Sequence, residues 1–110
     1  MLNINIEFRK GILFVRLNGI LDKHTLVNFK KEVSDLIDIN GIKYLVMNLK
    51  DLEYIDDLGI KQLTNDYRKI SSLDGKVVIC GVEEKDYKKE LSNYTYISQN
   101  ELKAFQLINI

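Results

Sequence analysis

Residues 43–60 read KYLVMNLKDLEYIDDLGI, and this stretch contains the pattern that decides the fold. Its run from Tyr44 to Met47 is apolar without alternation, which is typical of a strand covered on both faces of a sheet. The polar segment after it leads into a helix whose predicted buried stripe consists of Ile60, Leu63, Tyr67 and Ile70. A covered strand followed by an amphipathic helix indicates a β-α-β unit with parallel strands.

The residues before this stretch predict an antiparallel hairpin and a first helix. Residues 3–9 alternate between apolar and polar side chains, and a Lys-Gly turn connects them to a second, mostly apolar strand at residues 12–21. Gly19 is expected to break this second strand. A helix should follow from about Thr25 and end at Gly41, because glycine readily adopts the left-handed conformation of a C-cap.

The residues after the stretch predict a third parallel strand and a smaller C-terminal part. Residues 76–81 (KVVICG) read as a short buried strand, and residues 82–93 as a mostly polar helix with Tyr87 and Leu91 facing inward. A last short strand is expected near residues 95–97. Ser and Glu at the spacing S-x-x-E, residues 98–101, then suggest a capping box at the start of a final amphipathic helix.

Length and composition limit the class of protein. The 110 residues suit one domain, predicted over residues 1–110, and the order of elements indicates an α/β fold: a mixed β-sheet with an N-terminal antiparallel hairpin, β-α-β units and helices packed on the sheet. The 16 basic and 16 acidic side chains sum to zero formal charge, which argues against nucleic acid as a partner. No apolar run approaches the roughly 20 residues of a membrane span, and the first ten residues do not resemble a signal peptide. We therefore expect no direct membrane insertion and a cytoplasmic protein.

The densest polar feature runs from Lys50 to Asp57, at the carboxyl end of the central strand. Sites in open α/β sheets concentrate at such strand ends. Asp56 and Asp57 also suit the start of a helix, as an N-cap and a first-turn acid, and on these residues alone this interpretation is favoured. A metal-dependent hydrolase would need further converging carboxylates, and Asp22 is the only obvious candidate.

His24 and Cys80 are the other candidates for chemistry. A lone His at a helix start is more often a surface or partner contact than a general base, and no Ser or Cys has a recognisable nucleophile setting. Cys80 lies in an apolar run and is expected to be a buried core residue. One His and one Cys cannot supply an ordinary zinc site, and a Gly-rich phosphate loop is absent, so no cofactor is predicted.

Three segments together resemble the STAS domain family, and within it the bacterial anti-sigma factor antagonists. They are FVRLNGILDKHT, KYLVMNLKDLEYIDDLGI and GKVVICGV, in the order and at the spacing of the family. The resemblance implies a STAS fold over nearly the whole chain, no enzymatic activity, and transcription regulation through a partner that is both a serine kinase and an anti-sigma factor. It implies partner contacts at Asp22, His24, Thr25, Asp56, Asp57, Leu58, Gly59 and Lys61.

Asp57 is the departure from the family that matters most. It stands where these antagonists carry a phosphorylated Ser or Thr, and it has no hydroxyl, so the usual phosphorylation cannot occur there. An Asp carries about −1 charge, against roughly −1.5 to −2 for a phosphoserine, so it is an imperfect phosphomimetic. Lys61 follows it by four residues, a spacing at which the two side chains can pair on a helix and offset part of this charge.

The resemblance leaves several functions open. In one hypothesis the chain is an antagonist that docks its partner regardless of phosphorylation. In another, Asp57 keeps the chain in a state like the one released from the anti-sigma partner, and the protein acts as a signalling scaffold. A cytosolic STAS subunit of a membrane transport complex is the alternative from a different class, and an enzyme is the least favoured. We expect a monomer or a weak dimer.

Overall fold

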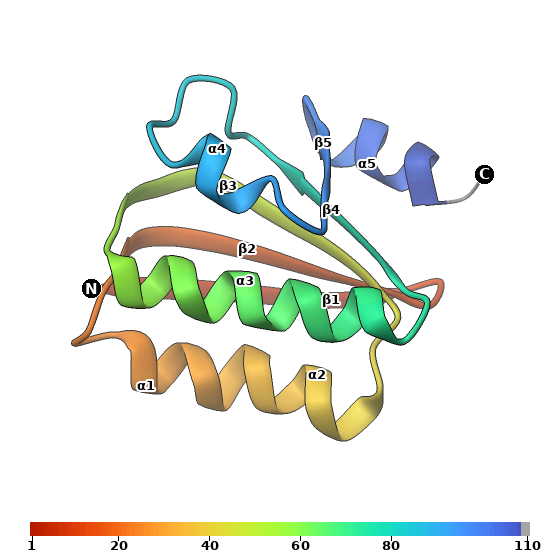
Figure 1. The fold of residues 1–110 in the computed structure, drawn as a ribbon, viewed down its shortest axis with the longest axis horizontal. Coiled ribbons are helices and arrows are strands. Elements are labelled where there is room, and N and C mark those ends of the chain that lie inside the picture. The colour runs from red at the N-terminus through yellow and green to blue at the C-terminus, as the bar shows by residue number, and fades with distance from the viewer. Residues whose placement is uncertain (109–110) are drawn as a thin grey trace.

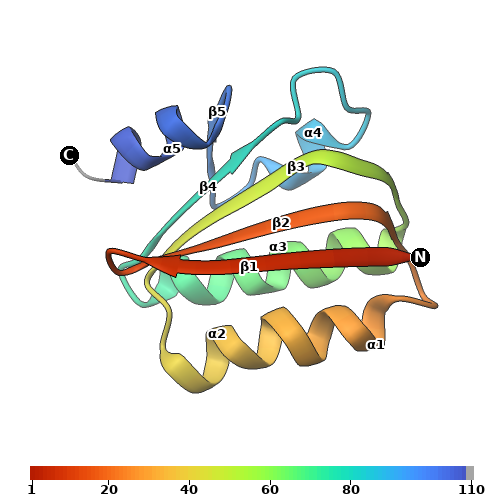
Figure 2. The same cartoon turned by 180° about the vertical axis from the view of Figure 1, so that it is seen from behind.

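The computed structural model describes residues 1–108 as a five-stranded sheet with helices packed on both faces (Figures 1 and 2). The strands lie across the sheet in chain order: β1 (Leu2–Arg9), β2 (Ile12–Leu21), β3 (Tyr44–Ile55), β4 (Lys76–Cys80) and β5 (Tyr96–Ser98). β1 and β2 pair antiparallel, and every other pair of neighbours is parallel. The predicted α/β class, with its N-terminal hairpin and β-α-β units, is confirmed.

The helices follow the predicted order. They are α1 (Leu26–Phe29), α2 (Asp35–Asn40), α3 (Asp57–Ser72), α4 (Lys88–Leu91) and α5 (Glu101–Ile108). A π-helical turn, η1 (Lys30–Ser34), joins α1 to α2, so that the three form one continuous helix beside α3 (Figure 1). This helix ends at Gly41 with φ 56°, as the sequence predicts. Within residues 1–108, no helix combines the length and apolar character needed to cross a membrane.

Buried side chains form two clusters, one on each face of the sheet. Alternate residues of β2 divide between them, because successive side chains of a strand point to opposite faces. Leu13, Val15 and Leu17 belong to the larger cluster with α1, α2 and α3, whereas Ile12 and Phe14 belong to the smaller cluster with α5. The larger cluster holds α3 against the sheet, so that its N-terminus lies directly after the end of β3.

The prediction that Gly19 breaks the second strand is wrong. β2 continues to Leu21, and its last residues pair in parallel with the end of β3, with register shifts on either side of Gly19. Gly19 has φ 110°, and a Cβ atom there would lie 2.2 Å from the carbonyl oxygen of Met1. Gly19 therefore allows a β-bulge and a close approach to the Met1 backbone, and it does not end the strand.

β3 is correspondingly longer than predicted. The sequence suggests a strand over residues 42–49 followed by a polar connection, but the strand continues to Ile55. Leu52 and Ile55 are buried in this extension, while the charged residues among them are exposed. Because these charged side chains point to solvent, the sequence of this half-buried strand resembles that of a loop.

The predicted helix over residues 82–93 is shorter than expected, with helical structure only at α4. Tyr87 and Leu91 are buried, as predicted. The Tyr87 hydroxyl donates a hydrogen bond of 3.0 Å to the carbonyl oxygen of Leu52, and Lys85 Nζ donates to the same oxygen at 3.1 Å. These two bonds attach the segment to the end of β3 without a regular helix.

The predicted capping box at residues 98–101 is also wrong. The Asn100 side chain accepts the N-terminal hydrogen bond of α5, from the backbone N–H of Lys103 at 2.9 Å. Glu101 turns toward the sheet instead, where both of its oxygens accept bonds of 2.7 Å from the Arg16 guanidinium. Asn48 donates to the same carboxylate at 2.8 Å.

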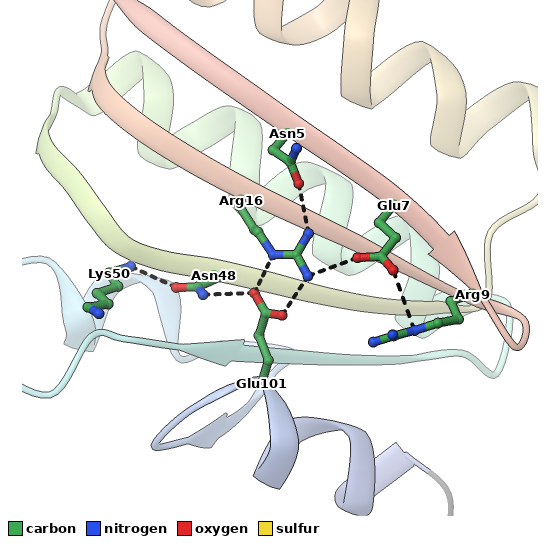
Figure 3. Close-up of polar contacts among 7 residues, drawn as sticks. All are labelled: Asn5, Glu7, Arg9, Arg16, Asn48, Lys50 and Glu101. Carbon is green, nitrogen blue, oxygen red and sulfur yellow. Dashed lines mark hydrogen bonds and ion pairs between the residues drawn. The ribbon is translucent and has the colours of Figure 1, made fainter.

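Arg16 is the centre of this polar cluster on the α5 face of the sheet (Figure 3). Its remaining donors bind Asn5 at 2.7 Å and Glu7 at 3.1 Å, both on the neighbouring strand β1. The hydrogen bonds from Arg16 hold the pKa of Glu101 below its usual value, although desolvation acts in the opposite direction. The cluster thus connects α5 to three strands through charge-assisted hydrogen bonds.

Candidate functional site

Asp56 joins the two predicted contact segments, residues 22–25 and 56–61. Its backbone is extended, and its Oδ1 accepts a bond of 2.8 Å from the Gly59 N–H, which makes it the N-cap of α3 as predicted. Its Oδ2 accepts from the backbone N–H of Lys23 at 2.9 Å. One carboxylate therefore fixes the start of α3 and the loop after β2 relative to each other.

Gly59 allows these two segments to approach closely. It is buried in the first turn of α3, and a Cβ atom there would lie 2.9 Å from the Leu21 carbonyl oxygen and 2.7 Å from Ile55 Cγ1. Any side chain would push the helix away from the ends of β2 and β3. Gly59 therefore has a packing role under the predicted contact surface and is not itself exposed to a partner.

Asp22 and Thr25 shape the loop between β2 and α1. The Asp22 Oδ1 accepts from the N–H groups of His24 at 2.9 Å and Thr25 at 3.2 Å, while the Thr25 hydroxyl donates to the Ile20 carbonyl at 2.9 Å. Desolvation acts to raise the pKa of Asp22, but the two N–H donors bring the pKa below its ordinary value. Asp22 and Thr25 hold the loop, and His24 is left exposed on it.

The outward side of the α3 N-terminus carries Asp57, Leu58 and Lys61. Asp57 and Lys61 are exposed, and Leu58 has 49% of its surface exposed. Among residues 1–108, Asp57 and Lys61 form no ion pair, so the helical pairing that their spacing permits is not made. The charge of Asp57 is not offset in that way.

Two grooves of opposite charge include residues of the first turns of α3, and Asp57 and Lys61 line different ones. The basic groove, of about 710 Å³, contains Lys61 and is lined by Leu26, Lys30, Leu58, Lys61, Gln62, Thr64, Asn65, Arg68, Asn93 and Tyr94. The acidic groove, of about 380 Å³, contains Asp57 and is lined by Glu53, Tyr54, Ile55, Asp57, Ile60, Glu84, Lys85, Asp86, Tyr87 and Glu90. Asp57, Leu58 and Lys61 were predicted from the sequence as contact residues, but the other residues of both grooves were not. The helical spacing of Lys61, Thr64 and Arg68 could have predicted the α3 wall of the basic groove. No sequence pattern predicts that Tyr94 lines the same groove.

The chemistry available at these residues is that of a recognition surface. Within the described part of the chain, no group of three or more His, Cys, Asp or Glu side chains is arranged to hold a metal ion. Cys80 is buried, as predicted, and desolvation raises the pKa of its thiol to about 12. The site presents exposed charges, one exposed apolar side chain and a rigid, hydrogen-bonded backbone.

A buried carboxylate, Asp66, lies next to the basic groove, and the sequence did not predict it. Asp66 on α3 is 1% exposed and accepts hydrogen bonds from Ser34 Oγ at 2.7 Å and from Gln62 Nε2 at 3.0 Å. Its pKa is raised by burial, against the effect of these two donors. Because Ser34 belongs to the π-helical turn, this network connects η1 to α3.

Comparisons with known proteins agree with the geometry. Residues 3–102 match the STAS domain family. The chain is 31% identical over 81 residues to an anti-sigma F factor antagonist of Paenibacillus polymyxa, a match that covers 74% of this chain and 69% of that protein. Its fold is similar to that of a putative anti-sigma factor antagonist from Thermotoga maritima, with a TM-score of 0.86, 21% identity and coverage of 97% and 95% of the two chains. It is also similar to the anti-sigma factor antagonist SpoIIAA in its unphosphorylated form, with a TM-score of 0.78, 15% identity and coverage of 97% and 98%. The match over most of the sequence and the shared fold place this chain in the STAS domain family.

Proposed function

We propose that the whole chain acts as one STAS domain that binds an anti-sigma factor and thereby antagonises it, without catalysing a reaction. The observation that carries the proposal is the pair of hydrogen bonds that Asp56 accepts, from the backbone N–H groups of Lys23 and Gly59. They join the loop after β2 and the start of α3 into one exposed surface. Preorganised backbone of this kind lowers the entropic cost of binding a protein partner. The partner is proposed to be an anti-sigma factor, because the relative of Paenibacillus polymyxa is an anti-sigma F factor antagonist. That this partner is also a serine kinase is what the resemblance to the antagonist family implies.

Within this proposal, Asp57 makes the antagonist insensitive to phosphorylation. Its single charge is exposed to water, where one ion contact is worth about 0.2–1 kcal/mol, so it weakens or strengthens docking only modestly. A phosphoserine would add about −1.5 to −2 charge and three acceptor oxygens at the same place. A carboxylate therefore leaves the surface near the unphosphorylated state, and a serine kinase finds no hydroxyl to phosphorylate at this position.

The test compares wild type with Asp57→Ser for binding to the cognate anti-sigma kinase. Without ATP, we expect both proteins to bind with dissociation constants within about fivefold, since only one exposed charge differs. After incubation with kinase and ATP, the Asp57→Ser variant should become phosphorylated and lose binding, while wild type keeps it. Asp35→Ser removes one exposed carboxylate elsewhere and is the matched control. Failure of wild type to bind, with recovery in Asp57→Ser, would show instead that Asp57 locks the released state.

A further inference from the structure

The basic groove and the acidic groove differ sharply in charge although residues of the first turns of α3 line both of them. The basic groove has three cations among its lining residues, Lys30, Lys61 and Arg68, and no carboxylate. Five carboxylates and one cation, Lys85, line the acidic groove, and the Lys85 Nζ donates to a backbone carbonyl. The zero net charge of the chain therefore conceals a surface divided into two fields.

The cations of the basic groove are free to bind a ligand. Among residues 1–108, Lys30 and Lys61 have neither an ion pair nor a side-chain hydrogen bond, and Arg68 has one bond of 2.8 Å to the Asn65 side chain. Lys69, the residue after Arg68, shows the contrast, because it is paired with Asp38 at 3.2 Å. An incoming carboxylate could pair with the groove cations without breaking an internal ion pair.

Two apolar side chains add a second kind of contact to this groove. Leu58 at the start of α3 and Tyr94 in the turn before β5 have 49% and 54% of their surfaces exposed. Tyr94 has φ 65°, and the hydroxyl of the next residue, Thr95, shares its one proton between the carbonyl oxygens of Leu91 and Ser92, each 3.1 Å away. Exposed Leu and Tyr beside free cations are typical of a protein-binding surface with an apolar centre and a charged rim.

We propose that the basic groove binds an acidic segment of the protein partner, with carboxylates at Lys30, Lys61 and Arg68 and an apolar side chain between Leu58 and Tyr94. This proposal rests on the proposed function and adds the chemistry of the partner segment. A nucleic acid fits less well, because its continuous phosphate backbone would extend from the basic groove toward the five carboxylates of the acidic groove. Asp57 belongs to that opposite field, so the same partner should place basic or neutral groups beside it.

The first experiment needs no natural partner. A ¹⁵N-labelled sample is titrated at about 50 mM salt, where screening is weak, with a synthetic peptide of Glu and Leu and separately with a Lys and Leu peptide. The acidic peptide should shift the amide signals of residues in the basic groove, and the basic peptide those of the acidic groove. Lys61→Glu combined with Arg68→Glu should weaken the first interaction at least tenfold. Lys43→Glu combined with Lys31→Glu has the same change in net charge outside both grooves and is the matched control. Equal weakening by the two double variants, or shifts spread over the whole surface, would overturn the proposal.

The second experiment uses the cognate anti-sigma kinase. If wild type binds it, the Lys61→Glu and Arg68→Glu double variant should weaken binding at least tenfold, and the control pair should change it by less than about threefold. Equal effects of the two pairs would refute the groove assignment while leaving the proposed function intact. If wild type does not bind the kinase in any form, the proposed function fails, and the peptide titration alone decides the charge preference of the groove. A short single-stranded DNA that competes with the acidic peptide for the same residues would identify a general polyanion site and would also overturn the proposal.

Discussion

At the scale of single residues, two aspartates in adjacent positions have different roles. Asp56 is half-buried and accepts hydrogen bonds from the N–H groups of Gly59 and Lys23, whereas Asp57 is exposed and lines the acidic groove. A carboxylate at an N-cap satisfies helix N–H groups that otherwise lack a partner. Asp56 therefore holds the surface together, and Asp57 contributes one of the charges that the surface presents.

Asp56→Ala is expected to destabilise the protein more than Asp57→Ala. The first substitution removes the cap of α3 and the bond to Lys23, and should lower the free energy of unfolding by about 1–2 kcal/mol. The second removes only a favourable charge near the helix N-terminus, worth about 0.3–1 kcal/mol. Urea unfolding of both variants with unchanged m-values would measure the difference. Equal losses would show that the two carboxylates contribute alike.

Asp66→Asn is expected to change how stability depends on pH. Burial raises the pKa of Asp66, so the native state binds its proton more tightly than the unfolded state. Stability from this group is therefore greatest below the unfolded pKa of about 3.9 and falls as pH rises through the higher native pKa. The variant lacks this fall, and its stability relative to wild type should increase as pH rises from about 4 to 7. Urea unfolding across this range, with Asp35→Asn as the exposed control, measures it, and parallel curves for wild type and Asp66→Asn would contradict it.

At the scale of elements, α5 is held to the sheet by both apolar and ionic contacts. Ala104 packs with Val46 and Val78 in the smaller cluster, and Glu101 pairs with Arg16. The side chains of Glu101 and Arg16 are 24% and 33% exposed, so solvent screens part of their attraction. The pair fixes the register and direction of α5 on the sheet, while the apolar contacts supply the area of burial.

Glu101→Gln is expected to loosen α5 without unfolding the sheet. Loss of the charge-assisted bonds should lower the free energy of unfolding by about 1 kcal/mol at neutral pH. Amide hydrogen exchange in α5 should become faster than in α3, because α5 opens locally. The low pKa of Glu101 stabilises the native state above about pH 4.3, and this contribution is lost as pH falls through the native pKa. Glu83→Gln is the exposed control, and an unchanged exchange rate in α5 would refute the role of the pair.

At the scale of the whole molecule, the sheet and α3 together separate charges that the sequence brings close. Asp57 and Lys61 are four positions apart, yet they line two different grooves along α3. The walls of these grooves come from distant segments: residues near 30 and 94 line the basic groove, and residues 84–90 line the acidic groove. A chain with equal numbers of acidic and basic groups thus presents two opposite fields at one helix.

The sequence alone was sufficient for the order of the elements and for the local signals. The apolar run from Tyr44 predicted the covered strand, Gly41 the end of the first helix, and Asp56 the cap of α3, because each depends on near neighbours in the chain. The candidate contact residues were also chosen from sequence, with the family resemblance supplying their proposed role. These features need no knowledge of which distant segments meet.

Only the tertiary structure decided how far the strands extend and how the surface is assembled. Residues 50–55 continue β3 because they pair with the end of β2 beyond Gly19, and their charged side chains concealed this from the sequence pattern. The bond between Asp56 and Lys23 spans 33 positions, and the bonds between Arg16 and Glu101 span 85. The two grooves also combine distant segments of the chain. Asp57 and Lys61 line different grooves and do not pair, although their spacing permits a pair. Local periodicity cannot reveal such contacts, because they form only when the folded sheet and its helices bring distant residues within hydrogen-bonding distance.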